Sequence, residues 1–141
     1  MLNNDFSSLD KKLALYVFTR MDIKPINRCV QSGHAAVQYL IKYPNPIYKN
    51  ELWTNGYLIY LQVDNEFSLN CLYDQFNVEG RNVAKFIEPD WGDPTCTAIS
   101  TLGYMGEDFT NYKLLSINTP LDKIFNKIKY ILKRSLKKAF N

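Results

Sequence analysis

The sequence has one histidine, His34, and only three cysteines among its 141 residues. The cysteines lie far apart and form no C-x-x-C pair, so they and the single histidine do not make a convincing zinc site. An odd, scattered set of thiols also provides no disulfide framework. These scarcities predict a reduced, cytoplasmic protein with no bound metal.

Several signature motifs are also missing. The chain has no G-x-S-x-G, Walker A, G-x-G-x-x-G or H-E-x-x-H sequence, which argues against the enzyme classes that depend on them. No apolar run approaches the roughly 18 residues that a membrane span needs. The first residues contain no apolar segment of the kind found in secretory signals. We therefore expect neither a membrane span nor a signal peptide.

Positive charge is concentrated at one end of the chain. Residues 120–141 contain seven Lys or Arg and one Asp, a net charge of +6. Residues 1–119 contain ten basic and thirteen acidic side chains, a net charge of −3. A phosphate-rich partner would therefore be attracted mainly to the C-terminal segment.

The pattern of apolar residues predicts an α/β fold. Helical spacing marks residues 25–43 and 65–80, and a third helix begins at Pro120. Runs rich in β-branched and aromatic residues predict strands over residues 13–19, 56–63, 82–87 and 95–102. This order of elements implies helices layered on a sheet. We divide the chain into a domain of residues 1–118 and a basic amphipathic helix of residues 119–141.

The helix predicted over residues 25–43 has an apolar stripe that we expect to face the sheet. At about 100° per residue, Asn27, Gln31, His34 and Gln38 share one flank beside this stripe. The flank is either one wall of a polar site or the ordinary polar edge of a packed helix. The stripe comprises Ile26, Cys29, Val30, Gly33, Ala36, Val37, Leu40 and Ile41.

The C-terminal helix combines an apolar stripe with a basic face. Thr119 is its predicted N-cap, Pro120 its first residue, and Asp122 lies near the positive end of its dipole. Three interpretations remain open: a helix docked on the body, a helix on an anionic membrane surface, and an RNA-binding arm. We favour docking on the body. Oligomerisation through this helix, as in a homodimer, is a further hypothesis.

Two polar stretches are expected at one edge of the sheet. The first strand ends at Arg20, just before the helix of His34, and the third ends before the loop of Asp90. If these strands run parallel, their carboxyl ends share an edge, where ligands of α/β sheets gather. An imidazole, a carboxylate and the hydroxyl of Thr97 can position and deprotonate a water there. Asp90 can equally be a turn residue, and Thr97 an ordinary strand residue.

Two motifs, and their order along the chain, resemble those of the type II peptidyl-tRNA hydrolases. The first comprises Arg20, Asp22 and Ile23, followed by Val30, Gln31, His34 and Ala35. The second comprises Glu88, Pro89, Asp90, Gly92, Thr97, Ala98 and Ile99. Between them lies a W-x-N-G segment at Trp53, Asn55 and Gly56. The resemblance implies a three-layer α/β/α domain with a four-stranded mixed sheet, and hydrolysis of the ester that joins a peptide to tRNA, without cofactor.

The resemblance also implies site residues. The expected catalytic residues are His34, Asp90 and Thr97, and the expected substrate-binding residues are Arg20, Asn27, Arg28 and Gln31. The two arginines would contact tRNA phosphates. Asn27 stands where the family pattern has a lysine. An alternative hypothesis is a binding module on the same fold that holds a nucleotide, a tRNA end or a protein partner without chemistry.

Overall fold

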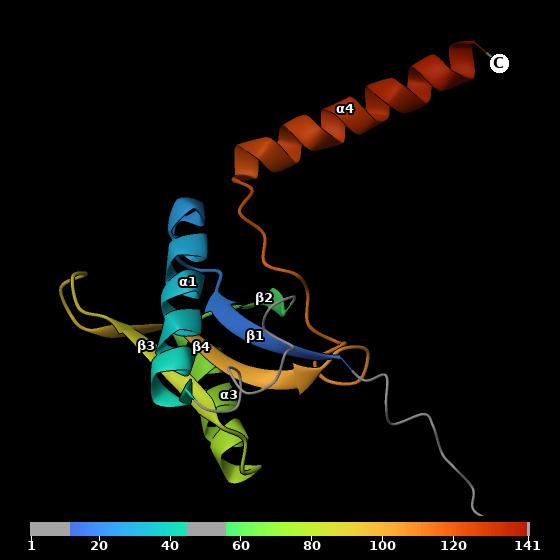
Figure 1. Cartoon of the computed structure of the whole chain (residues 1–141). Coiled ribbons are helices and arrows are strands. Elements are labelled where there is room, and N and C mark those ends of the chain that lie inside the picture. The colour runs from blue at the N-terminus through green and yellow to red at the C-terminus, as the bar shows by residue number, and fades with distance from the viewer. Residues whose placement is uncertain (1–11, 45–55, 141) are drawn as a thin grey trace, which may run out of the picture.

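The protein forms a mixed α/β structure (Figure 1). A computed structural model describes residues 12–44 and 56–140, so Trp53 and Asn55 of the W-x-N-G segment lie outside the described residues. The elements in chain order are β1 (Leu13–Arg20), α1 (Pro25–Lys42), β2 (Tyr57–Val63), α3 (Glu66–Val78), β3 (Val83–Glu88), β4 (Thr95–Tyr104) and α4 (Pro120–Ala139). These elements confirm the predicted order of strands and helices.

The four strands form one mixed sheet in the order β2-β1-β4-β3. Strands β1 and β2 are parallel, whereas β4 runs antiparallel to both of its neighbours, β1 and β3. Strands β1 and β3 therefore point the same way. Their carboxyl ends lie at the same edge of the sheet as the beginning of β4, as expected for the candidate site.

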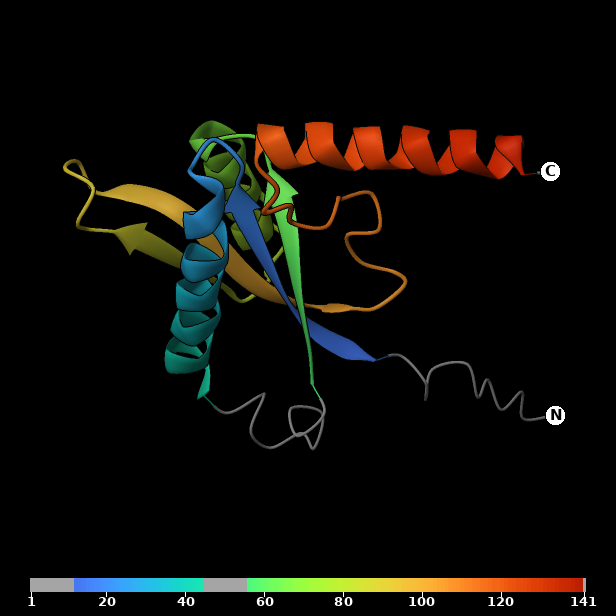
Figure 2. The ribbon, with the colours of Figure 1, turned by 90° about the horizontal axis from the view of Figure 1, so that it is seen from above.

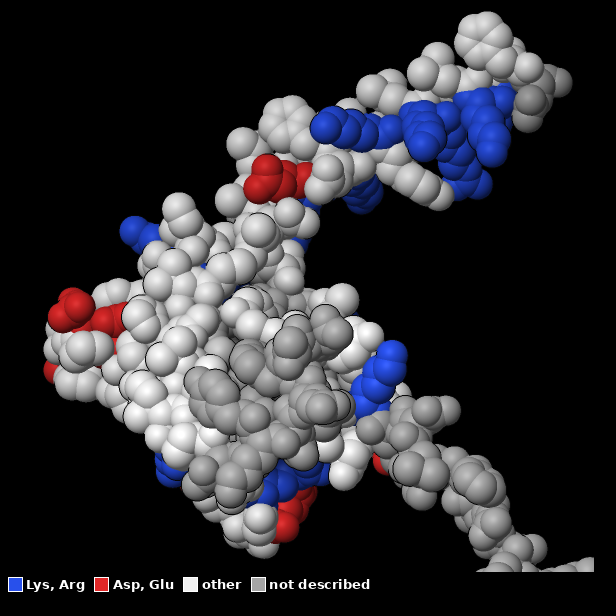
Figure 3. Space-filling view, viewed as in Figure 1, with Lys and Arg blue, Asp and Glu red and all other residues white. Residues whose placement is uncertain are grey.

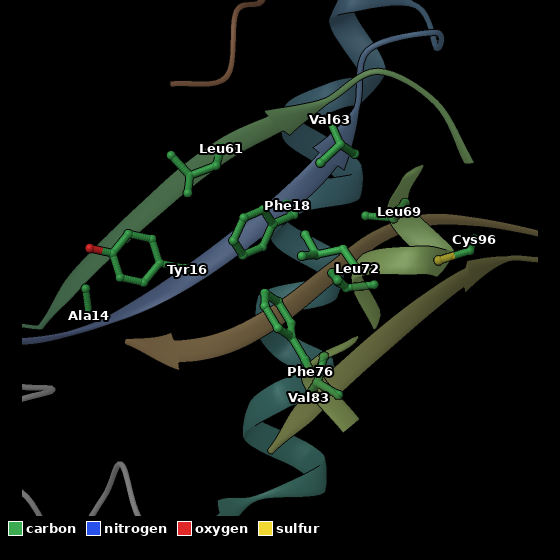
Figure 4. Packing of buried hydrophobic residues seen from close by; sticks show 11 residues of the cluster. Ala14, Tyr16, Phe18, Leu61, Val63, Leu69, Leu72, Phe76, Val83 and Cys96 are labelled. Carbon is green, nitrogen blue, oxygen red and sulfur yellow. The ribbon is translucent and has the colours of Figure 1, made fainter. Parts of the chain in front are cut away.

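Helices α1 and α3 cover opposite faces of the sheet, which confirms the α/β/α layers (Figure 1). On the α3 side, Phe18 of β1 packs edge-on against Phe76 of α3, with ring centroids 5.5 Å apart (Figure 4). On the α1 side the core is built from smaller side chains around Tyr39. The central strands β1 and β4 are buried on both faces, which explains the nearly continuous apolar sequence of β1.

The prediction of which face of α1 is buried was wrong. Ile26 and Ile41 of the apolar stripe are 79% and 67% exposed, and Val30 and Val37 are also exposed. The side chains that face the sheet are Arg28, Gln31, Ser32, Ala35, Ala36 and Tyr39. The helix is therefore rotated about its axis so that much of its apolar stripe points to solvent.

Hydroxyl groups on the sheet explain this rotation. Thr19 and Ser32 share a hydrogen bond of 2.6 Å, and Ser100 Oγ donates to the carbonyl oxygen of Ala35 at 2.6 Å. These hydroxyls are buried, and a buried hydroxyl without a partner is costly. Ser32 supplies a side-chain partner that the Ile/Val stripe lacks.

Helix α4 extends away from the body in both views (Figures 1 and 2), and none of its residues is buried. The favoured expectation of a docked helix was therefore wrong. Helices α1 and α3 pack on the two faces of the sheet over β1, β3 and β4. The predicted start is confirmed, because Thr119 and Asp122 form a capping box. No helix in the described part of the chain is long and apolar enough to cross a membrane.

The segment between β4 and α4 is fixed to the body at several points. Phe109 packs in the aromatic cluster, with its ring centroid 5.0 Å from that of Phe18. Further along, the backbone N–H of Leu115 donates to the carbonyl oxygen of Tyr60 at 2.9 Å, and Leu114 forms a bridge with Leu61 on the edge strand β2. This irregular segment therefore determines where α4 begins.

Substitution of Gly103 tests how tightly the segment between β4 and α4 is packed. A Cβ atom there would lie 2.7 Å from Phe109 Cε2 and 3.1 Å from Tyr16 Cδ2. We expect Gly103→Ala to lower the free energy of unfolding by about 1–3 kcal/mol, because the core must shift to admit the methyl group. Chemical denaturation would measure the change.

Gly33→Ala is the matched control. A Cβ atom at Gly33 would meet nothing within 4 Å, and the residue lies inside a helix. We expect this variant to be more stable by about 0.5–1 kcal/mol, because alanine loses less backbone entropy on folding. Equal stability of the two variants would contradict the packing described for Gly103.

Candidate functional site

Arg20, at the carboxyl end of β1, joins several segments at the edge of the sheet. Its guanidinium donates two hydrogen bonds to the carboxylate of Asp22, at 2.6 and 2.8 Å. It also donates to Thr95 Oγ1 at 2.8 Å, and lies 3.3 Å from Glu66 Oε2. Arg20 therefore connects β1, the turn into α1, the start of β4 and the start of α3.

These contacts keep the neighbouring carboxylates ionised. The hydrogen bond and charge of Arg20 hold the pKa of Asp22 below its usual value. The pKa of Glu66 is lowered first by its hydrogen bond with Thr95, and also by the Cys96 N–H and the Arg20 charge. Because the guanidinium is already paired, Arg20 has little capacity left for the tRNA phosphate expected from the sequence.

Arg28 is likewise engaged within the protein. Its side chain is buried in α1 and donates to three backbone carbonyl oxygens: those of Met21 at 2.7 Å, Ile23 at 3.2 Å and Ser116 at 2.8 Å. The first two belong to the turn between β1 and α1, and the third to the segment before α4. Arg28 thus ties these two segments together, and it does not face solvent as a phosphate ligand would.

A line of buried hydrogen bonds connects the two motifs. Thr97 Oγ1 donates to Gln31 Oε1 at 2.5 Å, and Gln31 Nε2 donates to Glu88 Oε2 at 2.7 Å. The other carboxylate oxygen of Glu88 accepts the backbone N–H of Asp90 at 3.1 Å. Thr97 is 0% exposed and Gln31 is 2% exposed, so both are sealed from solvent. The structure therefore links β4, α1 and the loop after β3.

A β-bulge places Thr97 in this line. Phe86 pairs with Ala98 whereas Ile87 pairs with Cys96, so Thr97 is the extra residue on β4. In a regular strand, Thr97 and Ala98 would point to opposite faces. Here Ala98 packs in the α1-side core and Thr97 also reaches α1. The bulge turns the hydroxyl toward Gln31.

His34 and Glu88 lie next to each other at the edge of this network. The hydrogen bonds from Gln31 and the Asp90 N–H, together with the nearby His34, lower the pKa of Glu88. The imidazole of His34 is exposed and stacks on Phe86, with centroids 4.5 Å apart and planes inclined by 11°. His34 is therefore an accessible imidazole near an ionised carboxylate.

Asn27 and the loop after β3 border a surface pocket. This open pocket measures about 390 Å³ and is lined by Asp22, Ile23, Lys24, Asn27 and Trp91. It lies at the predicted edge, between the start of α1 and the 88–94 loop. Asp90 belongs to the same loop and is exposed.

The structure brings some of the candidate residues together at one edge of the sheet, but their side chains lie in different environments. Gln31 and Thr97 are internal, Arg20 and Arg28 are paired within the protein, and His34 is accessible to solvent. Among residues 12–44 and 56–140, no group of three His, Cys, Asp or Glu side chains is arranged to hold a metal ion.

Three residues at this edge were not proposed as site residues from the sequence: Lys24, Glu88 and Trp91. Lys24 and Trp91 line the pocket, and Glu88 is the centre of the hydrogen-bond line although it is only 7% exposed. A tryptophan within a Gly- and Pro-containing loop was an available signal for Trp91, because large aromatic side chains in loops often contact ligands.

Comparisons with known proteins give no assignment of family or function. No protein-family model and no curated protein matches this sequence. Among solved structures, a protein of unknown function from Agrobacterium tumefaciens is similar with a TM-score of 0.47 and 9% sequence identity. The match covers 65% of this chain and 87% of that chain. A similarity this distant carries no argument about activity.

The role of Arg28 can be tested by Arg28→Ala. This change leaves the carbonyl oxygens of Met21, Ile23 and Ser116 without their donor. We expect the free energy of unfolding to fall by about 2–4 kcal/mol, measured by chemical denaturation. Arg134→Ala on the exposed helix α4 is the control and should change stability by less than about 0.5 kcal/mol. A similar small effect of Arg28→Ala would argue against its bracing role.

The pairing of Arg20 with Asp22 predicts a pH dependence of stability. Because the pKa of Asp22 is lower in the folded protein, its contribution is complete above the usual carboxyl pKa and is lost as the pH falls through the folded value. Asp22→Asn should therefore destabilise the protein at neutral pH, by about 1 kcal/mol or less because water screens the pair. The difference from the unmodified protein should disappear toward about pH 2.

Denaturation midpoints across this pH range would measure the effect. Asp93→Asn, in the exposed loop after β3, is the matched control. A difference between Asp22→Asn and the unmodified protein that stayed constant down to the lowest pH would contradict a charge-based pairing.

Proposed function

We propose that the protein hydrolyses the ester bond of peptidyl-tRNA at the edge formed by β1, β3 and β4. One observation carries the proposal. The two stretches that resemble the type II peptidyl-tRNA hydrolases, residues 20–35 and 88–99, meet at this edge through the contacts from Thr97 to Gln31 and from Gln31 to Glu88. The α/β/α layers and mixed sheet are also those that the resemblance implies.

The chemistry of the pocket supports a nucleotide-containing ligand. The partly exposed ring of Trp91 offers a surface on which a base can stack, and Asn27 offers an amide for hydrogen bonds. Lys24 adds a cation for a phosphate. The family pattern has a lysine at the position of Asn27, and Lys24 supplies a positive charge to the same pocket.

In the proposed reaction, water adds to the ester carbonyl carbon and the bond from that carbon to the ribose oxygen breaks. The products are a peptide with a free carboxyl group and a tRNA with a free 3′ hydroxyl. The accessible imidazole of His34 accepts the proton of the attacking water and returns it to the leaving ribose oxygen. Asp90 orients the water, while Thr97 and Gln31 hold Glu88 in position.

A second candidate is a binding module that holds the same nucleotide ligand without hydrolysing it. Burial of Thr97 favours this alternative, because its hydroxyl donates to Gln31 and does not reach the pocket. The internal pairing of Arg20 and Arg28 also leaves fewer cations for a long tRNA contact. Binding at the pocket requires only Trp91 and Lys24.

Peptide release from an N-blocked aminoacyl-tRNA tests the hydrolase. We expect turnover by the full chain, and a loss of about 100-fold or more in kcat for His34→Ala, because general-base catalysis contributes on this scale. Asp90→Ala should also lower kcat. Asp93→Ala, in the same exposed loop, is the control and should retain activity. Turnover that is unaffected by His34→Ala would refute the assigned proton acceptor.

The same preparation distinguishes the second candidate. Quenching of tryptophan fluorescence by deacylated tRNA or a nucleotide, abolished in Lys24→Ala, together with no peptide release, would favour the binding module. Neither turnover nor binding by the folded protein would remove both candidates.

A further inference from the structure

Helix α4 presents an apolar surface that the body of the protein does not cover. All of its residues are exposed. At about 100° per residue, the Leu, Ile and Phe side chains of α4 fall within an arc of about 140°, the width of a helix face that is normally buried, whereas Tyr130 lies on the opposite side. These side chains are Leu121, Ile124, Phe125, Ile128, Ile131, Leu132 and Leu136.

The rest of the α4 surface is strongly basic. Seven Lys or Arg side chains lie outside the apolar arc, and Asp122 in the first turn is the only acid of the helix. Figure 3 shows these basic groups gathered along one side of α4, with uncharged atoms on the other. Lys129 and Lys138 lie at the two borders of the apolar arc, at about 90° from its centre. Lysines at these borders can extend their charges away from an apolar environment.

Two other partners, a second α4 helix and RNA, fit this surface less well. A second α4 helix would cover the apolar arc, but the bordering Lys129 and Lys138 would then face further lysines with no carboxylate to pair with. RNA would neutralise the basic side but leave the Ile, Leu and Phe side chains in water. An anionic lipid surface satisfies both sides at once, because it offers negative headgroups above an apolar interior.

We propose that α4 binds the surface of a membrane that contains anionic lipids, lying in the plane of the interface with its apolar arc toward the acyl chains. A helix of 20 residues is about 30 Å long, so the contact would be extended. The connecting segment is fixed to the body by Leu115 and by Arg28 through Ser116. Membrane binding would therefore hold the whole body near the surface. This inference is independent of the proposed function.

Co-sedimentation of the full chain with lipid vesicles tests the proposal. One set contains phosphatidylcholine alone, and the other also contains phosphatidylglycerol. We expect binding to the anionic vesicles that is about tenfold tighter or more, and that weakens as the salt concentration rises. Absence of binding to either kind of vesicle would overturn the proposal.

A pair of variants separates the apolar face from net charge. Ile128→Asp and Asn126→Asp introduce the same residue at positions about 160° apart around the helix. We expect Ile128→Asp to weaken binding to anionic vesicles by about tenfold or more, and Asn126→Asp by less than about threefold. Equal weakening in both variants would overturn insertion of the apolar arc. Since α4 has no buried residue, both should keep the denaturation midpoint of the body.

Dimerisation through α4 and binding of RNA to α4 are measured in parallel. A dimer in solution that Ile128→Asp converts to a monomer, without vesicle binding, would assign the arc to a second copy of the chain. Salt-sensitive retention of tRNA by α4 without vesicle binding would assign the helix to RNA. Either result would overturn the membrane proposal.

Discussion

A single guanidinium at the end of the central strand holds the edge of the sheet together. Arg20 contacts Asp22, Thr95 and Glu66, which belong to three segments that are distant in sequence. The carboxylate of Asp22 accepts from Nε and Nη2, whereas Thr95 and Glu66 both lie at Nη1, so the rigid fork of arginine donors fixes their relative positions. The turn into α1 and the start of β4 are thereby placed at the same edge, where the pocket and the hydrogen-bond line from Thr97 to Glu88 are built.

The sequence was sufficient to predict the elements and the α/β layers, because local propensity and long-range packing agree in β1, β4 and α3. It failed for the buried face of α1. Periodicity identifies an apolar stripe, but it does not identify the surface that the stripe meets. The buried hydroxyls of Thr19 and Thr97 reverse the expected choice, since they bond to polar side chains that Ile26 and Val30 cannot provide. Polar contacts between sheet and helix thus determine the rotation of α1.

The location of the candidate site could also be predicted, because the direction of β1 and β3 brings their carboxyl ends to one edge. The environment of each residue could not. Arg20 and Arg28 carry the same charge and lie close together in the sequence. In the structure Arg20 is paired with carboxylates, whereas Arg28 donates to three carbonyl oxygens. The bulge at Thr97 arises from the pairing of two strands, so it cannot be predicted from the local sequence pattern. A cation in a motif is therefore weak evidence for a phosphate contact until its internal partners are known.

The two amphipathic helices show why an exposed apolar stripe must be interpreted together with its borders. On α1, the buried Gln31 and Ser32 are neutral and form hydrogen bonds with the sheet, which accounts for the orientation of the helix. On α4, seven Lys or Arg side chains lie outside the apolar arc, and two of them, Lys129 and Lys138, border it. Docking of the arc on a protein core would place these two ammonium groups against apolar surface, whereas at an anionic interface they extend to the headgroups. The apolar arc and its lysine borders therefore favour a partner that accepts the apolar and basic sides of α4 in different layers.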